Sequence, residues 1–147
     1  MQIYGTKAMK QGVIVIPFDY AGHMHLQQRG PEAKIAANKW EVPQGKKELS
    51  DMSLEAAAIR ELREETGYEA KLEDLRKIGY FEKGTKYALT VYAWYSCVDL
   101  HPIVPEGEPM QQAKLISISD AIRCDLDDNS KIALALYTSY VTLDLWQ

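Results

Sequence analysis

The chain has 147 residues, a length typical of one domain with a substantial apolar core. Its net charge of −4 at pH 7 argues against broad, non-specific affinity for nucleic acid. It has no low-complexity linker or internal repeat, no apolar run long enough to cross a membrane, and no signal-peptide core in residues 1–7. We therefore expect a single domain over residues 1–147, located in the cytoplasm.

The first predicted elements are two strands, at residues 12–18 and 23–29. Side chains alternate along a strand, so His23 and His25 are expected on one face of the second strand. No cysteine or third histidine accompanies them at the spacing of metal ligands, so we expect no zinc site there.

A short strand at Trp40 is predicted to end in the turn at residues 43–45, and a polar loop then leads to a helix. Ser53 is a good N-cap for this helix. An apolar stripe that includes Leu54, Ala58 and Leu62 would bury one of its sides.

The helix carries a group of carboxylates at Glu61, Glu64 and Glu65. Positions i, i+3 and i+4 lie on one side of a helix, so these charges converge and repel one another. A hard divalent cation such as Mg²⁺ or Mn²⁺ would relieve the repulsion. The alternative is a solvated acidic face without ligands.

Beyond this helix, strands are predicted at residues 76–81, 87–98 and 114–117. A second helix is predicted at residues 130–143, from the spacing of its apolar residues. Strands interrupted by isolated helices favour an α/β fold.

The central segment resembles the motif of the Nudix hydrolase family, the MutT-like hydrolases: G-x5-E-x7-R-E-U-x-E-E-x-G-U, in which U is aliphatic or aromatic. The matching residues are Gly45, Arg60, Glu61, Leu62, Glu64, Glu65, Gly67 and Tyr68. Residues 26–29 and 40–45 also resemble the segments that precede the motif in this family. The resemblance extends from about residue 12 to about residue 119 and implies an α/β/α sandwich with a mixed β-sheet between helices.

One position departs from the motif. Gly45 and Arg60 are fifteen positions apart, whereas the family spaces them by fourteen. Counting forward from Gly45 puts Asp51 at the first motif glutamate, and counting back from Arg60 puts Met52 there. Asp51 is a shorter substitute, whereas a methionine cannot ligate a hard cation.

The resemblance implies that Glu64 and Glu65 are the main ligands of Mg²⁺ or Mn²⁺, together with the backbone carbonyl of Gln44. Glu61 would be a further ligand or the general base. Arg60 would pair with one of the glutamates and hold its rotamer. The alternative for Arg60 is an ordinary ion pair on the helix surface.

The implied reaction is attack of water on phosphorus within a diphosphate linkage, assisted by divalent ions. Glu61 is the first candidate for the base, and Glu106 or Glu108 in a downstream acidic loop are the others. We also expect Glu108 among the metal ligands. Gln111 and Gln112 lie near the last strand, where an amide would be a poor base.

The sequence indicates the substrate less directly than it indicates the reaction. Arg29, Lys83 and Lys86 are candidate phosphate contacts, and Tyr87 is a candidate for stacking on a nucleobase. Each of these side chains also suits an ordinary surface or core position. Nucleoside triphosphates, dinucleoside polyphosphates, nucleotide sugars and ADP-ribose all remain open, and so does a monomeric or homodimeric state.

Two other functions stay open. The displaced first glutamate suggests a Nudix fold that has become a nucleotide-binding or regulatory module. An RNA 5′-end pyrophosphohydrolase is the other, and it would need a basic groove that an acidic chain does not favour.

Overall fold

The computed structural model describes residues 9–145, in which seven strands form one sheet. The order is β3-β2-β1-β6-β5, with β4 paired to β1 and β7 paired to β2. β1 and β6 run parallel, and the other pairs are antiparallel, so the sheet is mixed. The strands are β1 (Lys10–Phe18), β2 (Met24–Arg29), β3 (Trp40–Glu41), β4 (Gln44–Lys46), β5 (Leu75–Lys83), β6 (Tyr87–Tyr95) and β7 (Met110–Ile116).

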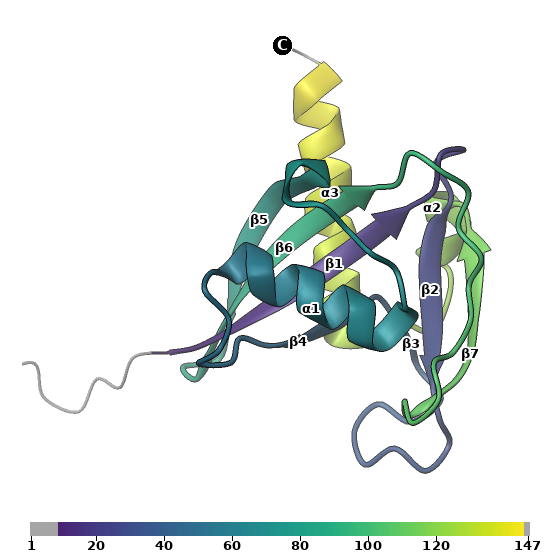
Figure 1. Cartoon of the computed structure of the whole chain (residues 1–147), viewed down its shortest axis with the longest axis horizontal. Helices are drawn as coiled ribbons and strands as arrows, with labels where there is room; N and C mark the ends of the chain where they lie inside the picture. The colour runs from purple at the N-terminus through teal and green to yellow at the C-terminus, as the bar shows by residue number, and fades with distance from the viewer. Residues whose placement is uncertain (1–8, 146–147) are drawn as a thin grey trace, which may run out of the picture.

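Two long helices cover the two faces of the sheet. α1 (Leu54–Thr66) lies in front of the strands in Figure 1, and α3 (Asp128–Leu145) passes behind them. A short 3₁₀ turn, η1 (Leu72–Asp74), and a short helix, α2 (Ile118–Ala121), complete the described elements. The predicted α/β/α sandwich with a mixed sheet is confirmed.

The central strand β1 is apolar on both sides. Val13 and Val15 pack in the cluster beneath α1, and Ile14 and Ile16 pack in the cluster toward α3. A strand with helices on both faces needs such a continuous apolar run rather than an alternating one. β1 therefore anchors both layers and supports α1 from below.

Several predicted boundaries need correction. The first strand begins at Lys10, β6 ends at Tyr95 rather than at residue 98, and β7 covers Met110–Ile116 rather than residues 114–117. β5 and α3 are also longer than predicted, and the local pattern indicated neither η1 nor α2. Strand ends depend on partners across the sheet, which the local pattern does not contain.

The segment predicted as a turn at residues 43–45 overlaps the strand β4, in which Gln44 pairs with Ile14 of β1. The expectation that His23 and His25 share a strand face is also wrong. β2 begins at Met24, so His23 lies in the preceding turn and is exposed, whereas His25 is fully buried.

Across residues 9–145, no helix is long and apolar enough to cross a membrane. The expectation about a signal peptide concerns residues 1–7, which lie outside the described residues. The cytoplasmic location stays a prediction.

Candidate functional site

The acidic helix α1 is held at both ends by its own sequence. The Ser53 side chain caps its N-terminus by accepting a hydrogen bond from Ala56 N at 3.0 Å. Gly67 ends it in the left-handed region, at φ 79°, where glycine is favoured. The buried residues Ala58 and Leu62 press one side of the helix against β1. Glu61 and Glu65 lie next to this buried side, on the edge of the helix that faces β4.

Glu61 lies against the backbone of β4. A Cβ atom built on Gly45 would stand 2.1 Å from the Glu61 carboxyl carbon, so any side chain at Gly45 would displace this carboxylate. Burial raises the pKa of Glu61, and the neighbouring negative charge of Glu64 adds to the shift. Gly45 therefore allows a carboxylate to sit directly beside the strand.

Glu65 is the most buried of the three helix carboxylates. Its Oε1 accepts a hydrogen bond from Gln27 Nε2 at 2.8 Å, and its Oε2 accepts one from the backbone N of Gln44 at 3.1 Å. Burial raises the pKa of Glu65 well above its usual range, and the nearby Glu61 carboxyl contributes further. A buried acid beside a half-buried one favours a cation between them.

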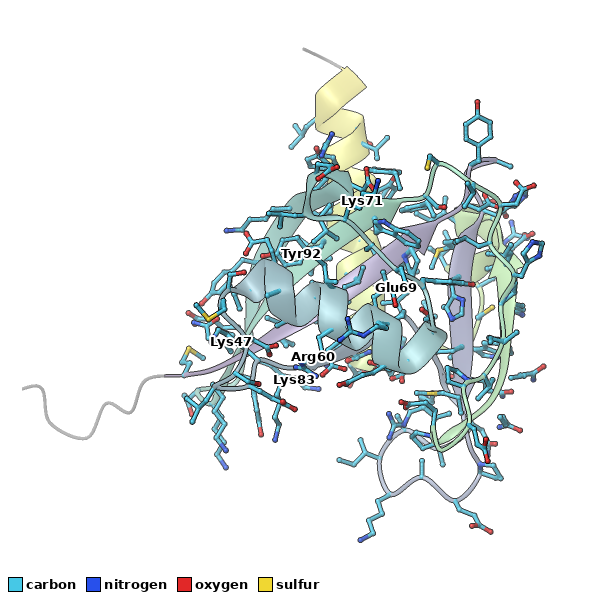
Figure 2. All side chains as sticks on the ribbon, in the orientation of Figure 1. Lys47, Arg60, Glu69, Lys71, Lys83 and Tyr92 are labelled. Atoms are coloured by element: carbon cyan, nitrogen blue, oxygen red, sulfur yellow. The ribbon has the colours of Figure 1, made fainter. Side chains whose placement is uncertain are left out.

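Arg60 ties the loop to the helix. Its Nη1 donates to Glu61 and to Glu64, at 3.0 Å each, so it contacts two glutamates where pairing with one was predicted. Its Nη2 also donates to the Lys46 carbonyl oxygen of β4 at 2.9 Å. Figure 2 shows Arg60 along the lower edge of α1. One guanidinium therefore orients two carboxylates and the neighbouring strand.

The structure shows which of the two loop residues, Asp51 or Met52, contacts the site. Asp51 accepts hydrogen bonds from Arg60 Nε and Nη2, at 2.9 Å each, and is buried. The hydrogen bonds from Arg60 lower the pKa of Asp51 to about 2. Met52 is 93% exposed, so it takes no part in this site. The loop therefore accommodates its extra residue by turning Met52 outward.

The downstream acidic loop reaches the same cluster through one residue. Burial raises the pKa of Glu108, and the charges of Glu64 and Glu61 act in the same direction, which places Glu108 near them. Glu106 is exposed. The Gln111 amide donates to the Arg29 carbonyl oxygen of β2 and to Asn38 Oδ1, and the Gln112 amide donates to Gln28 Oε1 of β2. Both amides therefore tie β7 to β2 and the loop that follows it, rather than bond to the cluster.

The donor types at this cluster suit a hard divalent cation. Carboxylate and carbonyl oxygens are the ligands that Mg²⁺ and Mn²⁺ prefer. Burial raises the pKa of Glu61 and of Glu65 because it disfavours their charged forms, a cost that a bound cation would offset. In residues 9–145, no three acidic, histidine or cysteine side chains are already arranged around a common point. Arg60 instead takes one oxygen each from Glu61 and Glu64.

A cleft of about 690 Å³ opens beside the cluster, and Gln44 and Gly45 belong to its lining. Three of the predicted substrate contacts also line it: Arg29, Lys83 and Tyr87. Lys86 is exposed on the same hairpin and is not among the lining residues. Of the aromatic residues on β5 and β6, Tyr87 faces the cleft, whereas most of the others pack in or against the two cores.

The cleft also contains polar residues that the sequence reasoning missed, namely Glu41, Asp127 and Asn129. Glu41 is 2% exposed, and burial and the negative charge of Asp127 raise its pKa to about 7. Gln44 Nε2 joins the two acids, donating to Glu41 at 3.3 Å and to Asp127 at 3.1 Å. A charged residue between the apolar residues of a short strand was the available signal for Glu41.

Comparison with known proteins agrees with this architecture. The family model of the NUDIX domain matches residues 9–137. No curated protein matches the chain significantly.

Solved structures match the fold at low sequence identity. The NUDIX domain of Shewanella oneidensis NrtR complexed with ADP ribose gives a TM-score of 0.74 at 16% identity, covering 92% of this chain and 90% of that one. A MutT structure from work on Aliivibrio salmonicida and Vibrio cholerae gives 0.71 at 22%, with 90% and 99% covered. A NUDIX hydrolase from Alicyclobacillus acidocaldarius gives 0.70 at 13%, with 89% and 91% covered.

Proposed function

Because this chain belongs to the Nudix family of pyrophosphohydrolases, whose model matches residues 9–137, we propose that it hydrolyses a diphosphate linkage in a nucleoside-diphosphate compound, in a metal-dependent reaction. The observation that carries this proposal is that the carboxylate cluster on α1 adjoins the cleft. Gln44 and Gly45 of β4 line the cleft on one side and contact Glu65 and Glu61 on the other. A substrate in the cleft would therefore present its phosphates to the carboxylates.

The residues proposed to hold Mg²⁺ or Mn²⁺ are the carboxylates of Glu61, Glu64, Glu65 and Glu108 and the carbonyl of Gln44. When bound, the ions would lower the pKa of water and neutralise charge on the phosphate oxygens. Arg60 donates hydrogen bonds to Glu61 and to Glu64. It would keep its hydrogen bonds to both carboxylates while their remaining oxygens bind a cation.

The chain's own groups have separate tasks in this proposal. Glu61 accepts the proton of the attacking water, a task that its raised pKa favours. Glu108 is the alternative base, since its pKa is also raised by burial. Arg29 and Lys83 would contact phosphates and Tyr87 would stack on the base, since all three line the cleft.

The first experiment is hydrolysis of a substrate panel with Mg²⁺ or Mn²⁺. The panel holds nucleoside triphosphates, dinucleoside polyphosphates, nucleotide sugars and ADP-ribose. Glu65→Gln tests the cluster, and Glu69→Gln is the matched control, because Glu69 follows the same helix and is exposed. The proposal expects turnover that depends on metal, is lost in Glu65→Gln and is retained in Glu69→Gln. Turnover that persists in Glu65→Gln would overturn it.

A second candidate is a nucleotide-binding module without catalysis. It is favoured by one observation, that Arg60 Nη1 already neutralises one oxygen each of Glu61 and Glu64 in place of a cation. Thermal stabilisation by a nucleotide, with no turnover across the panel in either metal, would support this reading and exclude the first.

A further inference from the structure

A line of hydrogen-bonded side chains runs beneath α1 and ends on Glu65. The Tyr68 hydroxyl lies 3.0 Å from His25 Nδ1, and His25 Nε2 lies 3.1 Å from Gln27 Oε1. Gln27 Nε2 then donates to Glu65 Oε1 at 2.8 Å. His25 and Gln27 stand two positions apart on β2, so they share the face that looks toward α1.

The direction of this line follows from its end. Gln27 donates an amide N–H to Glu65 Oε1, so its carbonyl oxygen faces His25 Nε2. The hydrogen of the His25 ring must then sit on Nε2, which leaves Nδ1 to accept from the Tyr68 hydroxyl. Burial lowers the pKa of His25 to about 4, so the ring is neutral near pH 7, as one donor and one acceptor require.

These polar residues occupy positions where apolar ones would serve the fold better. His25 and Gln27 are 0% and 1% exposed, and buried polar groups are costly unless they are fully bonded. On the other face of the same strand, Met24 and Leu26 pack in the apolar core toward α3. The presence of polar residues on the face of β2 toward α1 therefore needs an explanation other than core packing.

We propose that Tyr68, His25 and Gln27 are positioning residues that form a one-way hydrogen-bond relay holding the Glu65 carboxylate in its rotamer for metal binding. The Gln44 amide holds the second oxygen of Glu65. Each oxygen keeps another lone pair free for a cation. This inference rests on the proposed metal-dependent function, but the relay itself exists without metal and can be tested there.

The metal-free test is ¹⁵N NMR of the His25 ring near pH 7. The relay expects the Nε2–H tautomer, with Nδ1 as the acceptor. Tyr68→Phe removes the donor to Nδ1 and shifts that signal, and Glu65→Gln weakens the charge-assisted end and shifts Nε2. Tyr95→Phe is the matched control, because it removes a hydroxyl contact of 3.1 Å to Tyr137 elsewhere in the fold. An Nδ1–H tautomer would overturn the relay, and so would an Nε2 chemical shift that is unchanged in Glu65→Gln.

The second test is Mn²⁺ binding followed by electron paramagnetic resonance, without substrate. Gln27→Met keeps the side-chain length but removes both hydrogen bonds, so we expect about 10–100-fold weaker binding. Tyr68→Phe acts at a distance and should weaken binding about threefold. In the Gln27→Met background, Tyr68→Phe should cause no further loss, because the relay is already cut.

The outcomes separate the two proposals. Additive losses of Mn²⁺ affinity in the double variant would mean that Tyr68 acts independently of Gln27, and the relay would be wrong. A wild-type protein that binds no Mn²⁺ would overturn the metal-dependent function, together with the metal-positioning role, whatever the NMR spectra show. Thermal unfolding of each variant distinguishes lost binding from lost folding.

Discussion

Asp51 and Arg60 form a two-pronged ion pair, in which the guanidinium Nε and Nη2 each donate to one carboxylate oxygen at 2.9 Å. Asp51 also accepts a hydrogen bond from the backbone N of Glu48 at 2.8 Å. The pair thus connects the loop before α1 to the residue that orients Glu61 and Glu64. Arg60 therefore links the loop before α1 to the acidic cluster.

Asp51→Ala should destabilise the protein by about 1.5–3 kcal/mol, the usual cost of losing hydrogen bonds to a charged group. It should also lower kcat, because Arg60 loses its anchor. Glu48→Ala is the matched control, since Glu48 meets the same guanidinium at 3.7 Å but is 61% exposed in its side chain. Urea unfolding and steady-state kinetics measure both effects. Equal effects of the two variants would contradict the special role of Asp51.

The same pair predicts an acid limit to stability. Hydrogen bonds from Arg60 lower the pKa of Asp51 from 3.8 to about 2 in the folded protein. A lowered pKa means that the pair's contribution is complete above about pH 4 and is lost as the pH falls toward 2. Unfolding free energies measured between pH 2 and 6 should show this slope in the wild type. The slope should be smaller in Asp51→Asn.

Glu41 predicts the opposite trend near neutral pH. Burial raises its pKa from 4.5 to about 7, so its contribution to stability is complete below about pH 4.5 and is lost as the pH rises through 7. Glu41→Gln should therefore stabilise the metal-free protein at pH 8 by up to about 3 kcal/mol. Urea unfolding from pH 4 to 8 in the presence of a chelator tests this. A variant as pH-dependent as the wild type would contradict it.

Gly45→Ala should impair catalysis more than folding. The added methyl group would stand 2.1 Å from the Glu61 carboxyl carbon, and the end of a side chain can move aside at little cost in stability. The displaced carboxylate would no longer be placed for the reaction, and a shift of about 1 Å can cost about 100-fold in rate. An unchanged kcat, with the melting temperature also unchanged, would show that the position of Glu61 is not critical.

Two neighbouring lysines test the cleft as the substrate site. Lys83 lines it and Lys86 does not, although both are exposed near the same hairpin. Lys83→Ala should raise KM about fivefold, as expected for an exposed charge contact of about 1 kcal/mol, and should leave kcat nearly unchanged. Lys86→Ala should have little effect on either. A larger effect from Lys86→Ala would move the phosphate site away from the cleft.

Some of the site could be predicted because its determinants are local. The N-cap Ser53 and the C-cap Gly67 define α1 within one turn of each end; Ser53 is the cap that was predicted, whereas Gly67 was identified only as a residue of the motif. The spacing of Glu61, Glu64 and Glu65 follows from 3.6 residues per turn, so their placement on one edge needed no other part of the chain. The residues of β1 likewise predicted a strand, within residues 12–18.

Tertiary structure alone decided the remaining features. Whether Asp51 or Met52 serves the site depended on how the loop closes onto Arg60, and counting positions left both possible. Glu41 meets Asp127, far along the chain, because the segment that precedes α3 pairs with Trp40 of β3. Gln27 reaches Glu65 through the layering of α1 on the sheet. Helix periodicity and caps act within a few residues, whereas loop closure, strand register and layer packing join distant segments, and these joined segments form the cleft and the relay.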